Sequence, residues 1–333
     1  MTTILVTGSE GSLMQAVIPR LLDDGYSVRG VDNFYRYGEV ARERRYEFVQ
    51  GDLADPQVAE RAVQGVDGVI QAAARIYGVG GFHKYAADIL SEDVLLHRNV
   101  LNACARHGVR RVAYVSSSMV FERAERHPVA ETDALEARIP YTEYGLSKVV
   151  GERLSMAFRK QYGLEYVIWR PFNIITPYEK GENEIGMSHV FADFIRNIVH
   201  EEKNPLPIIG DGQQIRCFTW IDDIADAIAR WSFAPSVEGE TFNLGNPEPI
   251  SMRDLARGIF EQAKQLGLLS DQNRALEFET VCSFNDDVRK RIPDISKATS
   301  RLGWHPSVGT EEAIRRCLRV SGRGAATELE RGA

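Results

Sequence analysis

The stretch ILVTGSEGSLMQAVIPRLL, residues 4–22, decides the fold. It joins a short β-rich run, ILVT, to a segment with apolar residues at helical spacing, and Gly8 and Gly11 stand at the turn between them. Free N–H groups at the start of such a helix can face a pyrophosphate. We therefore predict the first strand, turn and helix of a dinucleotide-binding sheet, with Ser12 and Leu13 beside the phosphates.

One position departs from this motif. A GxxGxxG pattern would place a third glycine at position 14, where this chain has Met14. A glycine there permits close contact between helix and strand. That contact must be made differently in this chain.

The alternation of strands and helices continues through the first half of the chain. The β-rich runs are ILVT (4–7), VRGV (28–31), YEFVQ (46–50), GVIQAA (68–73) and VAYVSS (112–117). The helical runs between them are AVIPRLLDDG, DPQVAERAVQG and DVLLHRNVLNACARHG, each closed by a glycine. This order predicts an α/β fold, a Rossmann-type doubly wound parallel sheet with right-handed crossovers.

The pattern loosens after about residue 170, which predicts a smaller C-terminal substrate-binding region. Pro and Gly cluster in ITPYEKGENEIG and NPLPIIGDGQQ, as is typical of binding loops. We expect residues 1–170 to form the cofactor-binding domain, with 211–245 packing back on it. Residues 171–210 and 246–320 would form the substrate-binding region, and 321–333 a weakly ordered tail.

Composition excludes several classes of protein. The 333 residues carry a formal net charge of −7, which argues against a nucleic-acid partner. No stretch approaches the roughly 18 to 20 apolar residues that span a bilayer, and we see no signal peptide. The four cysteines, Cys104, Cys217, Cys282 and Cys317, lie too far apart for a predicted zinc site or disulfide framework. A cytoplasmic enzyme without membrane contact or metal is expected.

Two acidic residues at strand ends indicate which dinucleotide binds. Asp32 lies 24 residues beyond Gly8 and can accept hydrogen bonds from the adenosine ribose. A carboxylate there repels a 2′-phosphate and favours NAD over NADP. Asp52 closes the third predicted strand and can reach the adenine edge, with Asn33 and Leu53 beside these acids. The alternative is that both acids only start turns.

A tyrosine and a lysine at helical spacing suggest acid–base chemistry. In YGLSK, Tyr144 and Lys148 are four residues apart and lie on one helix face. A free phenol has a pKa of about 10, and a cation one turn away favours the phenolate, which makes Tyr144 a usable base. Serines at 116–118 emerge at the carboxyl edge of the sheet, the usual ligand crevice of this fold. Without this context the pair would be two surface neighbours.

Further motifs follow in a fixed order. They are AAA (72–74), SSSMVF (116–121), YGLSK (144–148), RPFN (170–173), GDGQQIRCFTWIDD (210–223), NLG (243–245) and DISKATSRLGW (294–304). With GxxG, Asp32 and Asp52, this order resembles the extended short-chain dehydrogenase/reductases that act on nucleotide sugars, over roughly residues 3–318. The resemblance implies NAD as cofactor, a UDP-, GDP- or dTDP-linked sugar as substrate, and a homodimer formed through helices at 86–107 and 144–162.

The resemblance also implies roles for individual residues. Ser117, Tyr144 and Lys148 would be the catalytic triad, and Tyr144 and Lys148 would also contact NAD. Asn173 and Arg216 would contact the substrate diphosphate, and a guanidinium suits phosphate oxygens. The remaining cofactor contacts implied are Ala72, Ala73, Ala74 and Pro171, and the remaining sugar contacts Ser118 and Met119.

The loop ARIYGVGGFHKYAADIL at 74–90 resembles the Gly-rich loop of GDP-fucose synthase and GDP-mannose 3,5-epimerase. The resemblance places Gly80 and Gly81 beside the sugar. The SHV motif of GDP-fucose synthase, whose His is the acid, matches residues 188–190, so His189 becomes a catalytic candidate and Val190 a substrate contact. Those enzymes have Cys where this chain has Met119. The alternative for His189 is a polar residue at a helix start.

The departures at positions 118 and 119 narrow the range of reactions that the resemblance implies. The sugar 4,6-dehydratases carry an Asp-Glu pair where this chain has Ser118 and Met119, and the decarboxylases carry Glu at the Met119 position. Neither reaction is therefore favoured. Arg289, or Arg291 in its place, would supply the phosphate contact that the 4-epimerases make near residues 283–284.

The simplest reaction left is NAD-dependent epimerisation at C4 through a transient 4-ketosugar. The alternatives are a 3,5-type epimerase, a 4-oxidoreductase or dehydratase of the same family, and a protein of another class that binds NAD and a nucleotide sugar without turnover.

Overall fold

A seven-stranded parallel sheet forms the centre of the computed structural model, which describes residues 2–39, 43–281, 284 and 288–331, with side chains to residue 320. In spatial order its strands are β11 (Glu240–Leu244), β6 (Glu165–Pro171), β5 (Arg111–Val115), β4 (Gly68–Gln71), β1 (Thr3–Thr7), β2 (Ser27–Asp32) and β3 (Glu47–Gln50). Every neighbouring pair is parallel. The strand order reverses between β1 and β4, which confirms the predicted doubly wound Rossmann-type sheet.

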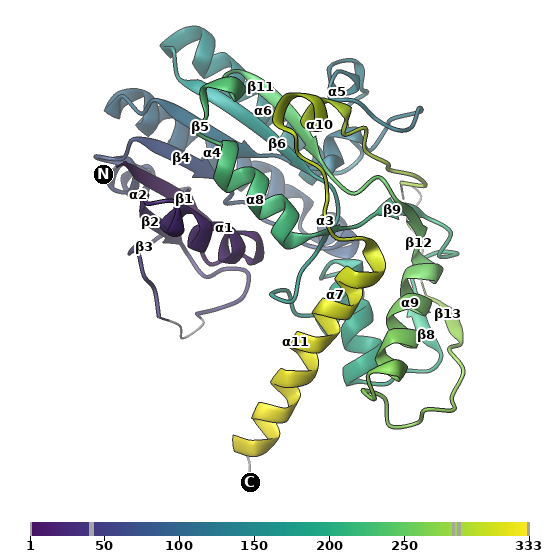
Figure 1. Ribbon diagram of the computed structural model, residues 1–333. Helices are drawn as coiled ribbons and strands as arrows, with labels where there is room; N and C mark the ends of the chain where they lie inside the picture. The colour runs from purple at the N-terminus through teal and green to yellow at the C-terminus, as the bar shows by residue number, and fades with distance from the viewer. Residues whose placement is uncertain (1, 40–42, 282–283, 285–287, 332–333) are drawn as a thin grey trace.

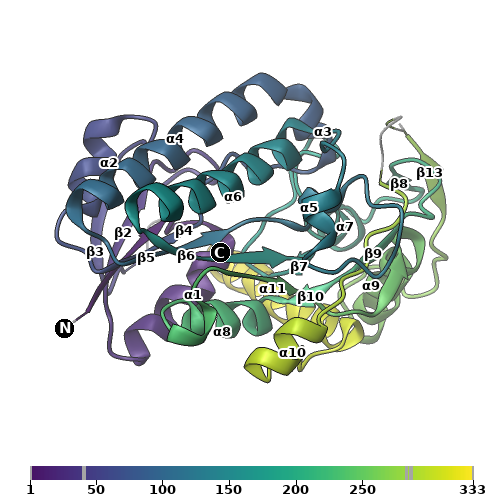
Figure 2. The same cartoon turned by 90° about the horizontal axis from the view of Figure 1, so that it is seen from above.

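Helices cover both faces of this sheet (Figure 2). On one face lie α2 (Pro56–Val63), α4 (Ala86–His107) and α6 (Glu143–Tyr162), and on the other lie α1 (Ser12–Asp23) and α8 (Ile221–Trp231). Successive residues of a strand point to opposite faces, so Ile4 and Val6 join the core under α1 and α8, and Leu5 joins the core under α2 and α4. Burial on both faces explains why the three central residues of β1, at 4–6, are apolar.

The chain returns to the sheet late in its course. Residues 211–245 include α8, which packs against α1 through Arg20 and Asp222 at 2.7 Å, and β11, which pairs with β6. The seventh strand is therefore separated from its neighbour by about 70 residues of chain. The segment EYVIWRP of β6 is a strand of this sheet that lies outside the β-rich runs named above, although its β-branched and aromatic residues favour one.

A smaller region lies beyond the carboxyl edge of the sheet (Figure 1). It contains short strand pairs and two helical segments. The pairs are β7 (Ile174–Ile175) with β10 (Thr219–Trp220), β8 (Leu206–Ile208) with β13 (Phe278–Thr280), and β9 (Ile215–Cys217) with β12 (Pro249–Ser251). The helical segments are α7 (Val190–Ile195), continued by a π-helical turn at Arg196–His200, and α9 (Met252–Gln265).

Six further helical elements complete the described part of the chain. They are α3 (Val79–Lys84), η1 (Ser118–Phe121), α5 (Asp133–Glu136), η3 (Pro235–Val237), α10 (Ser296–Leu302) and α11 (Thr310–Arg331). The backbone of α11 is helical over most of the segment 321–333 that was expected to be weakly ordered, and residues 332–333 lie outside the described residues. Among the described helices, none has the length and apolar character that crossing a bilayer requires.

Candidate active site

A cavity of about 420 Å³ lies at the carboxyl edge of the sheet, where β1, β2, β4 and β5 end. Most of the residues predicted for the site line it. They are Gly8, Gly11, Ser12, Leu13, Asp32, Asn33, Asp52, Leu53, Ala72, Ala73, Ala74, Ser117, Ser118, Met119, Tyr144, Lys148, Pro171, Asn173, His189, Val190 and Arg216. The predicted cofactor, catalytic and diphosphate residues therefore share one cavity.

The loop after β1 has the geometry that a dinucleotide requires. Gly8 has φ +65°, and a Cβ on it would lie 3.0 Å from the Cα of Ala73. Gly11 is the N-cap of α1 and has no side chain to occupy the first-turn N–H groups. Because glycines at 8 and 11 leave the N-terminus of α1 unobstructed, this loop fits a bound pyrophosphate. Met14, at the position of the missing third glycine, is buried in the core under α1.

Asp32 ends β2 with its carboxylate at this loop. Its Oδ2 accepts a hydrogen bond of 2.9 Å from the Glu10 N–H, and its Oδ1 accepts one of 2.8 Å from the Phe34 N–H. Burial raises the pKa of Asp32 above its ordinary value, and these backbone donors oppose that effect. Asp52 lies on the next strand end, where its Oδ2 accepts a hydrogen bond of 3.0 Å from Asn33 Nδ2.

Replacing Asp32 with Ser should weaken NAD binding and reduce discrimination against NADP, because the carboxylate that repels a 2′-phosphate is removed. The measurement is the ratio of NAD to NADP affinity in the two proteins. Replacing the exposed Asp55, which caps α2 outside the cavity, is the control. A wild-type protein that already prefers NADP would contradict the ribose assignment.

The predicted catalytic residues come from two neighbouring elements. Ser117 follows β5 and its Oγ accepts a hydrogen bond of 3.1 Å from the Met119 N–H, while Tyr144 and Lys148 lie in α6. Burial raises the pKa of Tyr144 above its ordinary value and outweighs the opposing hydrogen bond with Ser117, so the phenolate that Lys148 was expected to favour does not form in the ligand-free protein. The Lys148 Nζ donates to the Val115 carbonyl at 3.3 Å, and burial lowers the pKa of this lysine. Serine, phenol and ammonium groups thus meet at one wall of the cavity.

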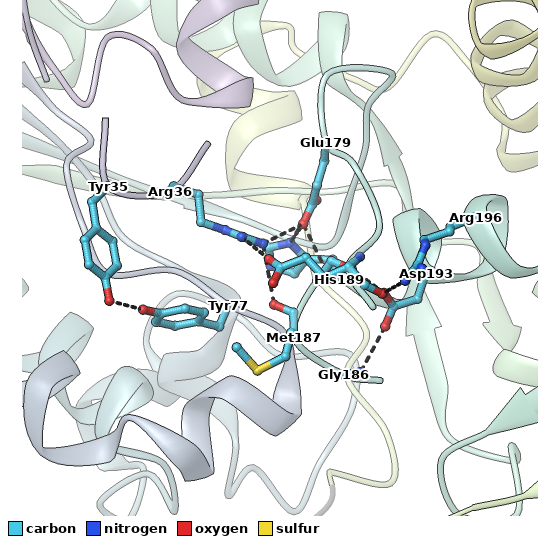
Figure 3. A network of polar contacts seen from close by, with 11 residues as sticks. Tyr35, Arg36, Tyr77, Glu179, Gly186, Met187, His189, Asp193 and Arg196 are labelled. Carbon is cyan, nitrogen blue, oxygen red and sulfur yellow. Dashed lines mark hydrogen bonds and ion pairs between the residues drawn. The ribbon is translucent and has the colours of Figure 1, made fainter. Parts of the chain in front are cut away.

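A second wall carries a charged network (Figure 3). His189 Nδ1 lies 2.8 Å and 2.9 Å from the two carboxylate oxygens of Glu179, and its backbone N–H donates to the same group at 3.1 Å. Burial opposes protonation of His189, but the Glu179 carboxylate outweighs burial and raises the pKa of His189. Arg36, from the loop after β2, lies 3.8 Å from Glu179 and also pairs with Glu182. This network joins the cofactor side of the cavity to the segment that precedes α7.

Three predicted site residues do not line the cavity. Gly80 and Gly81 lie within α3, and their N–H groups face the Gly186 carbonyl at 2.9 Å and 3.4 Å. The glycine of this loop that does line it is Gly78, where a Cβ would lie 2.0 Å from the Ser188 carbonyl oxygen. The Gly-rich loop thus makes close backbone contact with residues 186–188, and the sugar contacts at Gly80 and Gly81 stay predictions, at residues outside the cavity lining.

Arg289 also lies outside the cavity lining, and its phosphate contact stays a prediction. Its guanidinium is exposed and pairs with Asp211 at 2.9 Å outside the cavity. The alternative named with it, Arg291, lines the cavity and donates to Asn173 Oδ1 at 3.1 Å. In an extended segment, residues two apart lie on the same face, so the sequence alone does not select between Arg289 and Arg291. The selection depends on the register of this segment against β9.

Two residues of the charged network, Arg36 and Glu179, were not predicted. Each has a signal in the sequence. Arg36 follows a strand whose carboxyl end faces the ligand crevice, and Glu179 lies in the Pro- and Gly-containing loop at 176–186. Of the four cysteines, Cys104, Cys217 and Cys317 are buried thiols, and Cys282 lies outside the described residues.

Known proteins resemble this chain over almost its full length. It is 29% identical over 321 residues to a putative UDP-glucose 4-epimerase of Methanocaldococcus jannaschii, covering 95% of this chain and 97% of that protein. It is 28% identical to the GDP-mannose 3,5-epimerase of Arabidopsis thaliana, covering 94% and 80%. The names of these two relatives refer to different epimerisations, so similarity alone does not select the reaction.

Solved structures share the fold. An epimerase from Methanothermobacter thermautotrophicus superimposes with a TM-score of 0.84 at 25% identity, over 100% of this chain and 95% of that one. The UDP-glucose 4-epimerase of Thermotoga maritima, solved with UDP-glucose, has a TM-score of 0.81 at 24% identity, over 97% and 100%. Residues 4–245 match the sequence pattern of the NAD dependent epimerase/dehydratase family. The chain therefore belongs to this family, whose members are extended short-chain dehydrogenase/reductases that use NAD.

Proposed function

We propose that this protein inverts C4 of a nucleotide-diphosphate sugar through a transient 4-ketosugar. The observation that carries the proposal is the meeting of Ser117, Tyr144 and Lys148 in the cavity that the dinucleotide loop also lines. When bound, NAD supplies the reversible oxidation of the C4 hydroxyl. The cofactor residues proposed are those of the loop at 8–13, Asp32 and the strand ends at 52–53 and 72–74.

Separate side chains transfer protons and position the substrate and the cofactor. Tyr144 loses its proton more readily beside the positive nicotinamide ring of bound NAD. The phenolate then accepts the proton of the C4 hydroxyl and returns it after the ketosugar has turned over. Ser117 holds the same hydroxyl by a hydrogen bond, and Lys148 anchors the nicotinamide ribose. Asn173 and Arg216 hold the diphosphate, with Arg291 beside them, because guanidinium groups bind phosphate oxygens in pairs.

The residues at positions 118 and 119 support epimerisation over dehydration. Ser118 and Met119 stand where a dehydratase needs an acid and a base, and a thioether cannot move a proton. The nearby Glu122 lines the cavity, but both of its carboxylate oxygens accept hydrogen bonds from Thr142, one from the backbone N–H at 2.8 Å and one from the hydroxyl. These hydrogen bonds give Glu122 a structural role at the start of α6.

A 3,5-type epimerisation is the second candidate, and the His189–Glu179 pair is the observation that favours it. A carboxylate that fixes Nδ1 of an imidazole leaves Nε2 to exchange a proton with a ligand. Inversion at C3 or C5 needs a second titrating group on the other face of the sugar ring. Met119 occupies the position where the related enzymes place that group.

Solvent isotope incorporation separates the two reactions. We expect turnover in deuterated water to leave no deuterium at C3 or C5 of the product. We also expect His189→Ala mainly to raise KM, which indicates lost ground-state binding. The measurement is mass spectrometry and proton NMR of the product, with His107→Ala, on the outer end of α4, as the control. Deuterium at C3 or C5, together with a collapse of kcat in His189→Ala, would favour the second candidate.

We further propose that α4 and α6 form the contact of a homodimer. These two helices pack side by side on the outer face of the sheet (Figure 2). Leu95 and Tyr162 are exposed apolar residues on them. Light scattering after gel filtration should give twice the chain mass, and the mass of one chain would contradict the dimer.

A further inference from the structure

A buried carboxylate, Asp93 of α4, lies beneath the candidate active site. Its side chain has no exposed surface. Its Oδ1 accepts a hydrogen bond of 2.7 Å from the Arg75 N–H, and its Oδ2 accepts one of 3.0 Å from the Ser147 hydroxyl. Ser147 directly precedes Lys148 in α6. Asp93 is therefore fixed beside the helical turn that carries the candidate lysine.

Lys148 needs a counterion at this place. Only 2% of the residue is exposed, and burial disfavours the charged ammonium and lowers the pKa of Lys148. Two carboxylates oppose this effect, Asp93 more strongly than Glu152. An isolated buried ammonium is costly, so one of these carboxylates must balance it if Lys148 is to stay charged.

Glu152 is already balanced by another cation. Its two oxygens accept hydrogen bonds of 2.8 Å and 2.7 Å from Arg170, and one of them also accepts a hydrogen bond of 2.6 Å from the Ser116 hydroxyl. The hydrogen-bond donors to Asp93 are a backbone N–H and a hydroxyl, which are neutral. The guanidinium of Arg75 pairs instead with Glu92.

The other titratable groups that face Lys148 carry no charge. The ring nitrogens of His97 lie 3.1 Å from Gln71 Nε2 and 3.0 Å from the Tyr114 hydroxyl. Burial and the nearby Lys148 lower the pKa of His97 well below its ordinary value, so this imidazole is neutral. Burial raises the pKa of both Tyr114 and Tyr144, so their phenols keep their protons in the ligand-free protein.

We propose that Asp93 is a positioning residue that keeps Lys148 charged inside the protein. Asp93 is not among the residues that line the cavity, so it acts through Lys148 and not on the sugar or the cofactor. The inference deepens the proposed function, because the role of Lys148 as the cation of the triad rests on that function. The charge state of Lys148 does not rest on it and can be measured separately.

The pair should be fully charged only within a window of pH. Burial raises the pKa of Asp93 to about 6, so its carboxylate is ionised above that pH and protonated below it. Lys148 loses its proton on the alkaline side, at a pKa below the ordinary value for lysine. At acidic pH, protonation of Asp93 therefore removes the negative charge that balances Lys148. At alkaline pH, Lys148 itself loses its charge.

The test follows the titration of Lys148 by NMR of protein labelled with carbon-13 at lysine Cε. The Lys148 resonance is the one missing from the Lys148→Met variant. We expect Asp93→Asn to lower the midpoint of this titration by about one pH unit or more, as expected for losing a nearby opposite charge. Asp93→Glu should restore most of the shift. Asp88→Asn, the same change on the exposed face of α4, should leave the midpoint unchanged.

An unmoved midpoint in Asp93→Asn would overturn the proposal. If that variant does not fold, Ser147→Ala replaces it, since it removes only the hydroxyl that orients Asp93 and should lower the midpoint by a smaller amount. No change in Ser147→Ala would then overturn the proposal. The alkaline limb of the kcat/KM profile should move with the NMR midpoint. A midpoint that moves while the profile stays unchanged would overturn the triad role of Lys148 and leave the Asp93 inference intact.

Discussion

Replacing Tyr144 with Phe is expected to lower turnover by about a hundredfold or more, the range expected for removing a general base. The ring of Tyr144 is buried and stacks on Phe82 at 4.5 Å, so the variant keeps this packing and loses only the hydroxyl beside Ser117. Nucleotide-sugar affinity should change little, because the proposed diphosphate contacts, Asn173 and Arg216, are other residues of the cavity. The measurement is kcat for the variant, with binding followed by calorimetry.

The control is Tyr162→Phe, the same change in the same helix at an exposed position. It should leave both turnover and affinity unchanged. Near-normal turnover in Tyr144→Phe would remove Tyr144 from the mechanism. A loss of sugar affinity equal to the loss of turnover would indicate a binding role in place of proton transfer.

Replacing Arg170 with Met is expected to lower the free energy of unfolding by about 3–5 kcal/mol, the range for breaking a buried ion pair by removing one partner. Arg170 is 1% exposed and forms two hydrogen bonds with Glu152 at 2.8 Å and 2.7 Å. Met fills similar volume but leaves the Glu152 carboxylate buried without its cation. The measurement is urea-induced unfolding of the two proteins at neutral pH.

Arg230→Met is the matched control for this prediction. Arg230 pairs with Asp226 at 3.3 Å, and both side chains are exposed. A surface pair of this kind contributes less than about 1 kcal/mol. Equal losses in Arg170→Met and Arg230→Met would contradict the assignment of Arg170 and Glu152 as a buried structural pair.

Local patterns in the sequence were sufficient for five of the seven strands of the sheet and for the residues predicted at the cofactor side of the cavity. ILVT, Gly8 and Gly11 predict strand, turn and helix from neighbouring residues, and Asp32 follows at a spacing fixed by one helix and one strand. The spacing of Tyr144 and Lys148 likewise predicts a shared helix face. Each of these predictions needs only contacts that are close in sequence or that the parallel topology imposes.

The partners of these residues could not be predicted in the same way. His189 meets Glu179 and Arg36 because two loops converge over the cavity, and Arg36 lies more than 140 residues earlier in the chain. Asp93 meets Ser147 through the packing of α4 on α6. The sequence shows that these residues are polar, but only the three-dimensional structure shows which of them face one another.

The Gly-rich loop shows a second reason why the site could not be fully predicted from the sequence. Its sequence correctly marks a place where side chains are excluded, but three glycines at 78, 80 and 81 offer several explanations. The atom that a Cβ on Gly78 would meet is a backbone carbonyl of residue 188, far away in sequence. The demand for glycine therefore comes from packing between two loops, and no sugar contact is needed to explain it.

The most direct test of the account is the fate of a deuterium label at C4 of a nucleotide sugar. The purified protein with its retained NAD would be incubated with C4-labelled UDP-, GDP- and dTDP-hexoses, and the products analysed by NMR and mass spectrometry. We expect one of these sugars to be converted to its C4 epimer with the deuterium still at C4, accompanied by a transient rise in NADH absorbance. A product that has lost the C4 label to solvent, or binding of the sugars with neither product nor redox signal, would contradict it.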